Sequence, residues 1–184
     1  MSTLTQPKRQ SGFTLVELLI VVIILAILAA IVIPQFSSAT KDTQESALDA
    51  NLAGMRNAVE LYKVQHNGWP GAVATSAGPA CTGGTIGAAT ANTEAALVES
   101  LTRFSDKSGN TCSVQVGNYK FGPYIRKAIP TDPIKEIATV VVTSTGTPIV
   151  PAAATGGWAY DTASGQIVVN SNAVDTKGAA YYLR

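Results

Sequence analysis

The stretch FTLVELLIVVIILAILAAIVI, residues 13–33, decides how the rest of the chain is read. It holds 21 residues, of which Glu17 alone is charged. As an α-helix rising about 1.5 Å per residue, it is roughly 31 Å long, enough to cross the hydrocarbon core of a bilayer. Lys8 and Arg9 precede it with no acidic residue beside them. By the positive-inside rule, the N-terminus stays in the cytoplasm and the chain beyond Pro34 lies outside.

Three interpretations of this segment are open on the residues alone. It is a secretory signal peptide cut near Ser37 and Ala39, a permanent membrane anchor, or the start of a precursor that is cut before the apolar run. A carboxylate at a helix centre in lipid costs on the order of 3 kcal/mol, so Glu17 needs a partner. The nearby partner we expect is a new amino terminus at Phe13, one helical turn away. Such an amine exists only after a cut behind Gly12, which favours the third interpretation.

The segment KRQSGFTLVELLIVV, residues 8–22, closely resembles the start of type IV pilins and type II secretion pseudopilins. The resemblance covers about residues 8–66 and is weak beyond them. It implies that a prepilin peptidase cuts between Gly12 and Phe13 and methylates the new amine of Phe13. It also implies that Glu17 pairs with the Phe13 amine of a neighbouring subunit during assembly.

An amphipathic pattern continues the helix beyond Pro34. Apolar residues recur at spacings of four, three, four and three, which predicts one buried stripe: Leu48, Leu52, Met55, Val59 and Tyr62. Within a continuing helix, Pro34 removes the hydrogen bond to the Ala30 carbonyl and kinks or locally melts the chain. The alternative is that Pro34 ends the membrane helix. We predict one helix over residues 13–65, ended by the His-Asn-Gly-Trp-Pro run at 66–70.

The remainder predicts a small domain with a loop, a short helix and several strands. Residues 71–91 are mostly Gly, Ala, Thr and Ser, which indicates a surface loop, and Glu94 to Phe104 carries a one-faced helical pattern. β-branched and aromatic residues predict strands at 118–125, 137–143, 157–160, 166–170 and 180–183. The third and fourth of these form an antiparallel hairpin whose face accepts the helical stripe. The predicted fold is therefore α+β and pilin-like, a long N-terminal helix packed on a C-terminal antiparallel β-sheet.

The predicted organisation has four parts. Residues 1–12 are a cleaved prepilin leader, 13–34 a transmembrane or filament-core helix, 35–66 its amphipathic continuation, and 67–184 a globular head with an αβ-loop and an antiparallel sheet. Cys81 and Cys112 lie outside the cytoplasm in this topology, where such a pair is expected to form a disulfide. Closing that loop is worth roughly 3–4 kcal/mol. The alternative is two free buried thiols.

Composition and motifs argue against most catalytic and cofactor chemistry. With 13 basic and 12 acidic side chains, the net charge of +1 leaves no electrostatic footprint for nucleic acid. Two cysteines and one histidine are too few for a four-ligand zinc site. His66 is expected to serve the helix end rather than to act as a general base. We predict no enzyme, no catalytic residue and no cofactor.

Calcium is a weak candidate ligand. Major pseudopilins hold calcium in their C-terminal loops, and the Gly-Pro-Tyr and Pro-Thr-Asp-Pro segments at 122–124 and 130–133 vaguely resemble that region. On this resemblance the candidate ligands are Asp132, Glu136 and Asp161. The sequence departs from the pattern at 134–135, where Ile-Lys replaces the expected aromatic–glycine pair.

The resemblance implies a structural subunit of a type IV pilus-like filament. Its implied partners are identical subunits in a helical homopolymer, a prepilin peptidase, and an inner-membrane assembly platform with its ATPase. The precursor would lie in a bacterial inner membrane and the product in a surface pilus or a periplasmic pseudopilus. The cysteine pair and the long loop favour a pilus, whereas the segments at 122–124 and 130–133 favour a major pseudopilin. A membrane-anchored or secreted binding domain is the alternative of a different class.

Overall fold

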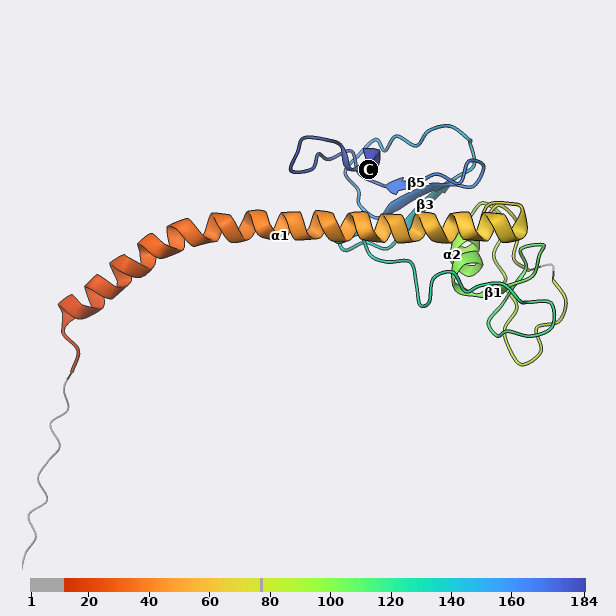
Figure 1. Ribbon diagram of the computed structural model, residues 1–184, viewed down its shortest axis with the longest axis horizontal. Helices are drawn as coiled ribbons and strands as arrows, with labels where there is room; N and C mark the ends of the chain where they lie inside the picture. The colour runs from red at the N-terminus through yellow and green to blue at the C-terminus, as the bar shows by residue number, and fades with distance from the viewer. Residues whose placement is uncertain (1–11, 77) are drawn as a thin grey trace, which may run out of the picture. The chain divides into compact units, whose positions relative to one another are not determined.

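The computed structural model describes residues 12–76 and 78–184 (Figure 1). The chain divides into two compact units between Lys41 and Asp42. The second unit, residues 42–184, is called the head unit below. The elements follow the chain in the order α1 (Leu15–His66), α2 (Glu94–Thr102), β1 (Phe104–Ser105), β2 (Thr111–Cys112), β3 (Val140–Thr143), β4 (Trp158–Asp161), β5 (Ile167–Val169) and the 3₁₀ helix η1 (Tyr181–Leu183).

Helix α1 is continuous from Leu15 to His66 and passes through Pro34. The predicted long helix is therefore confirmed, and the alternative in which Pro34 ends it is wrong. The local melting expected at Pro34 is not observed either. At the C-terminal end, Asn67 adopts a left-handed φ of 57° and its N–H donates to the Lys63 carbonyl at 2.8 Å. This left-handed residue closes the helix within the run at 66–70, as the sequence predicted.

The hydrophobic core of the head unit lies between α1 and the three-stranded sheet. All five residues of the predicted stripe are buried, with Leu48 fully so and Leu52 2% exposed. They pack with Trp158, Tyr160, Ile167 and Val169 of the sheet and with Leu97 and Leu101 of α2. Burying a side chain of this size stabilises a fold by about 1.5–3 kcal/mol, so this contact accounts for much of the stability of the head unit.

The sheet is mixed, with β4 in the centre of the order β3-β4-β5. Strands β4 and β5 pair antiparallel with Trp158 opposite Val169, which confirms the predicted hairpin. Strand β3 pairs parallel to β4 with Val140 opposite Trp158, so the prediction of an antiparallel sheet is wrong for this strand. The segment 144–157 supplies the long crossover that a parallel pair requires. β-branched composition carries no information about strand direction, which explains the error.

Two other predicted strands are wrong. Residues 118–125 form a loop with one isolated bridge, from Phe121 to Ser105. Gly117 and Gly122 in and beside this run have positive φ, which breaks an extended chain. Residues 180–183 hold η1, closed by the Leu183 N–H bond to the Ala180 carbonyl at 3.0 Å.

The short helix α2 is confirmed, although it ends at Thr102 rather than Phe104. Its N-cap is Thr93, whose hydroxyl accepts a hydrogen bond from Ala96 N–H at 3.2 Å. The two-residue strands β1 and β2 follow it as an antiparallel pair that the sequence patterns did not predict, with Phe104 opposite Cys112.

The loop over residues 71–92 lacks helix and strand among its described residues and is held to the head unit at separate tie points. Thr75 is one of them: it is fully buried, its N–H donates to Ala89, and its carbonyl accepts from Thr111 at 3.1 Å. Glu99 of α2 is another, because its carboxylate accepts the N–H groups of Ala88 and Ala89. Most residues between these points are exposed.

The disulfide between Cys81 and Cys112 supplies a further tie point. The two Cα atoms are 5.7 Å apart, and no cysteine in the described part of the chain is free. The expected bridge is therefore present, and the alternative of two free thiols is wrong. It fastens the middle of the loop to β2.

Candidate assembly segment

Among the described residues of its own unit, nothing covers the N-terminal part of α1. From Phe13 to Phe36 there are 17 large apolar side chains, each between 42% and 84% exposed. By length and composition this is a helix able to cross a membrane. Burying each of these side chains stabilises the protein by about 1.5–3 kcal/mol. Contact with lipid or with other apolar helices is therefore strongly favourable for this segment.

Glu17 has a partner that the sequence analysis overlooked. The N–H and the hydroxyl of Thr14 both donate to Glu17 Oε2, at 2.8 and 2.7 Å. In return, the Thr14 hydroxyl accepts the Glu17 N–H at 3.2 Å. This reciprocal arrangement is a capping box with Thr14 as N-cap, and its signal in the sequence is the Thr-x-x-Glu spacing. The inference that Glu17 has no nearby partner except a new Phe13 amine is therefore wrong.

The capping box leaves half of the carboxylate available. Both Thr14 bonds end on Oε2, and Glu17 Oε1 accepts no hydrogen bond from the residues that the structure describes. Gly12, Phe13 and Thr14 precede the first helical residue, and Phe13 is 84% exposed. The predicted leader falls on residues 1–12, of which 1–11 lie outside the described residues.

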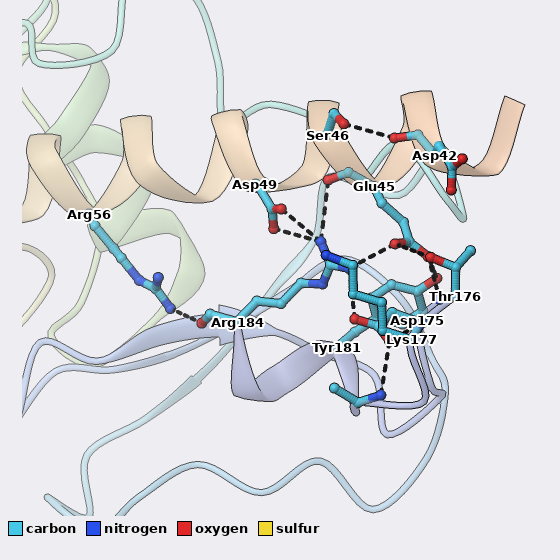
Figure 2. Close-up of polar contacts among 11 residues, drawn as sticks. Asp42, Glu45, Ser46, Asp49, Arg56, Asp175, Thr176, Lys177, Tyr181 and Arg184 are labelled. Atoms are coloured by element: carbon cyan, nitrogen blue, oxygen red, sulfur yellow. Dashed lines mark hydrogen bonds and ion pairs between the residues drawn. The ribbon is translucent and has the colours of Figure 1, made fainter. Parts of the chain in front are cut away.

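Where α1 enters the head unit, Arg184 fastens the helix to the C-terminal segment of that unit (Figure 2). The Arg184 guanidinium forms ion pairs with Glu45 and Asp49 of α1 and with Asp175, each at 2.8 Å. Burial acts to raise the pKa of Glu45, but hydrogen bonds from Thr176 and Tyr181 and the Arg184 charge outweigh it and leave that pKa below its ordinary value.

Asp161 lies at the end of β4, where it organises the turns on either side. Its Oδ1 accepts the N–H groups of Ala163 and Ser164, at 2.7 and 2.9 Å. Its Oδ2 accepts the N–H groups of Thr145 and Gly146, at 3.0 and 2.9 Å. Burial acts to raise the pKa of Asp161, but these bonds outweigh it and hold the pKa well below its usual range.

The other calcium candidates do not join Asp161 in one site. Asp132 is buried, and its two oxygens accept N–H groups of Ile134 and Gly157. Glu136 lies in the same turn as Asp132, with a left-handed φ of 58°. Within residues 12–76 and 78–184, no three acidic, His or Cys side chains are grouped as a metal site would require. Calcium binding stays a prediction without a preformed cluster.

His66, the last residue of α1, is a packing residue in this structure. Its ring stacks on Tyr62 with the centroids 3.9 Å apart, and Nε2 lies 2.9 Å from the Ser105 hydroxyl. Burial lowers the pKa of His66, against the opposing influence of its bond to the Tyr62 carbonyl and of nearby Asp106. These contacts fit the expected role at the helix end.

The chain thus combines an exposed apolar helix, whose first-turn carboxylate is held in a capping box, with a disulfide-bonded α+β head unit. Residues 7–33 match the prokaryotic N-terminal methylation motif. Over its N-terminal third, the chain is similar to type IV pilins and type II secretion pseudopilins, both in this motif and in the relatives described next.

Three curated relatives illustrate the similarity. The chain is 35% identical over 65 residues to type II secretion system core protein G of Aeromonas hydrophila, covering 35% of this chain and 46% of that protein. It is 42% identical over 62 residues to a type IV narrow pilus major component of Thermus thermophilus, covering 34% and 53% of the two chains. It is also 42% identical over 62 residues to a fimbrial protein of Neisseria meningitidis serogroup B, covering 34% and 36%.

The matched region spans about half of these relatives or less. No solved structure matches the chain. The similarity to these relatives therefore concerns the N-terminal helix alone, and the head unit is known only from its own geometry.

Proposed function

We propose that this chain is the structural subunit of a type IV pilus-like filament. It enters a bacterial inner membrane as a precursor, is cut between Gly12 and Phe13, is methylated on the new amine, and polymerises through residues 13–34. The observation that carries the proposal is the run of 17 exposed apolar side chains, interrupted by the single charge of Glu17. A bundle of identical helices offers these side chains the same apolar surroundings that lipid does.

The geometry at the start of α1 supports a role for Glu17 in that bundle. A positive amine at a helix N-terminus is disfavoured by the helix dipole and needs a carboxylate. Glu17 Oε1 is available for such an amine, while Oε2 stays bonded to Thr14. An incoming subunit can therefore pair its Phe13 amine with a neighbour's Glu17 without dismantling the helix cap. This pairing sets the axial register of each added subunit.

The first test is the N-terminus of the protein purified from cells, determined by intact mass and terminal peptide sequencing. The proposal expects a chain that begins at methylated Phe13. A chain that begins at Thr40 identifies an ordinary signal peptide, and an uncut chain identifies a plain membrane anchor. Either result refutes the proposal.

The second test replaces Glu17 with Ala. We expect Glu17→Ala to insert and be processed normally but to yield no filaments in a sheared-cell preparation. Glu60→Ala is the matched control, because Glu60 is an exposed carboxylate on the same helix with no ion pair among the described residues. Normal filaments from Glu17→Ala would favour the membrane-anchored or secreted binding domain.

A major pseudopilin of a type II secretion system is the second candidate, favoured by the similarity to core protein G of Aeromonas hydrophila. The two candidates differ in where the polymer is found and what its loss does. A pilus subunit is recovered from the cell surface by shearing. Loss of a pseudopilin stops protein secretion, and at normal expression no surface filament is lost.

A further inference from the structure

A groove with two unpaired lysines lies beside the C-terminal end of α1. It has a volume of about 320 Å³ and is lined by Asp106, Lys107, Ser108, Asn118, Lys120 and Phe121. The Asp106 carboxylate accepts the N–H groups of Ser108 and Asn110 and the Asn110 side-chain amide, so the groove holds two lysines against one carboxylate. Among the described residues, Lys107 and Lys120 form no ion pair. We call this surface the lysine groove.

A second groove, of about 300 Å³, has the opposite character and lies where α1 enters the head unit. Asp42, Glu45, Ser46, Asp49, Lys177 and Arg184 are among its lining residues (Figure 2). Three carboxylates, those of Glu45, Asp49 and Asp175, pair with Arg184, and with Asp42 the four carboxylates outnumber the two cations, Arg184 and Lys177. Asp42 is exposed and forms no ion pair within the described part of the chain, and the Asp49 side chain is 55% exposed. We call this surface the carboxylate groove.

The two grooves lie at opposite ends of the part of α1 that belongs to the head unit. The lysine groove lies next to His66. The ring centroid of His66 is 5.1 Å from that of Phe121, and its Nε2 contacts Ser105. The carboxylate groove begins at Asp42, 24 residues earlier on the same helix. The groove extends to Asp49, so at 1.5 Å per residue the two grooves are separated by about 26–36 Å along the helix axis.

We propose that the lysine groove of one copy of this chain binds the carboxylate groove of the next copy. The contact joins two different surfaces, so it is heterologous and repeats head to tail, which generates an open filament rather than a closed dimer. Two copies joined by this contact are displaced by about 26–36 Å along the helix axis, so they are not the pair joined through Phe13 and Glu17. The proposal rests on the proposed function and adds to it a contact between head units, separate from the apolar bundle.

Charge complementarity favours a second copy over other partners. The head unit carries 11 acidic and 10 basic side chains, so copies of it do not repel one another as whole bodies. Two lysines are too few for tight binding to nucleic acid, which relies on many phosphate contacts. The carboxylate groove, in contrast, is present on every neighbouring copy in a filament.

The test uses charge reversal in the full chain, expressed in filament-forming cells. We expect Lys107→Glu with Lys120→Glu to reduce sheared filaments about tenfold or more, because like charges facing across an interface cost several kcal/mol. Asp42→Lys with Ser46→Lys should cause a similar loss, and all four substitutions together should restore filaments. Arg126→Glu with Lys127→Glu is the control, since it reverses two exposed charges outside both grooves.

Cross-linking tests the register without altering any charge. Ser46 and Ser108 line the two grooves, and the native cysteines are joined in a disulfide. Filaments of the Ser46→Cys, Ser108→Cys chain treated with a short bifunctional maleimide should give a ladder of multimers, and either single variant should not.

The outcomes separate this inference from the proposed function. Protease resistance and an intact Cys81–Cys112 bridge show that each variant is folded. If the wild type forms filaments, three results would each overturn the contact alone. They are a normal filament yield from the lysine reversals, failure of the four-fold variant to restore filaments, and absence of a ladder. Absence of any wild-type filament would overturn the proposed function instead. Normal filaments with lost DNA retention would assign the lysine groove to phosphates.

Discussion

Replacing Asp161 with Asn removes a negative charge and alters few other features of the side chain. The amide keeps one acceptor oxygen and gains an NH₂ donor in place of the other. Whichever way the amide turns, the NH₂ faces two backbone N–H donors, either those of Ala163 and Ser164 or those of Thr145 and Gly146. Each donor that loses its partner in this fully buried site costs about 1–3 kcal/mol. We therefore expect Asp161→Asn to lower the free energy of unfolding by about 2–6 kcal/mol.

The assay is urea unfolding of the full chain in detergent, followed by tryptophan fluorescence, since Trp158 is fully buried beside the site. Asp42→Asn is the matched control, because the exposed Asp42 has no ion pair within the described residues and should change the free energy by less than about 0.5 kcal/mol. A loss below about 1 kcal/mol in Asp161→Asn would refute the role as a turn anchor. So would a wild-type protein that a calcium chelator destabilises as much as the substitution does, because Asp161 would then act as a calcium ligand.

Three further predictions concern the stability of the head unit. Replacing Cys81 and Cys112 with Ser should lower the free energy of unfolding by roughly 3–4 kcal/mol, and reductant should then have no added effect on the variant. Leu52→Ala should cost about 2–5 kcal/mol in the same urea assay, whereas Leu61→Ala, at a half-exposed position, should cost far less; equal losses would contradict the assigned helix face. Because the pKa of Glu45 is depressed on folding, its contribution is complete above its ordinary value of 4.5 and is lost as the pH falls below it; a melting temperature that stays constant down to about pH 3 would contradict this.

Features that depend on residues close in sequence were largely predictable. The 3.6-residue period of the apolar stripe located one face of α1, and the same stripe is buried from Leu48 to Tyr62. The hairpin of β4 and β5 followed from two β-rich runs separated by a short turn. The Thr14–Glu17 capping box is equally local, and its signal in the sequence is the Thr-x-x-Glu spacing.

Features that depend on distant residues were not predictable from one sequence. Arg184 pairs with Glu45 and Asp49 across 139 and 135 positions, and no spacing rule connects charges so far apart. The parallel direction of β3 depends on the path of the 144–157 crossover, which is irregular in structure and carries no periodic pattern. For the same reason, the lysine groove could not be predicted, because it forms where the turn at 106–108 lies beside the loop at 118–121.

Because a few tie points hold the 71–92 loop, the residues between them can be substituted more freely than those of the core. The path of the loop depends on Thr75, Glu99 and the Cys81–Cys112 bridge, and most residues between these points are exposed and uncharged. Substitutions of the exposed side chains there leave the core packing untouched, whereas the close-packed Gly78, Gly84 and Gly87 have no room for a side chain. The surface of this loop can therefore change one residue at a time, while the apolar helix through which the subunits are proposed to polymerise stays the same.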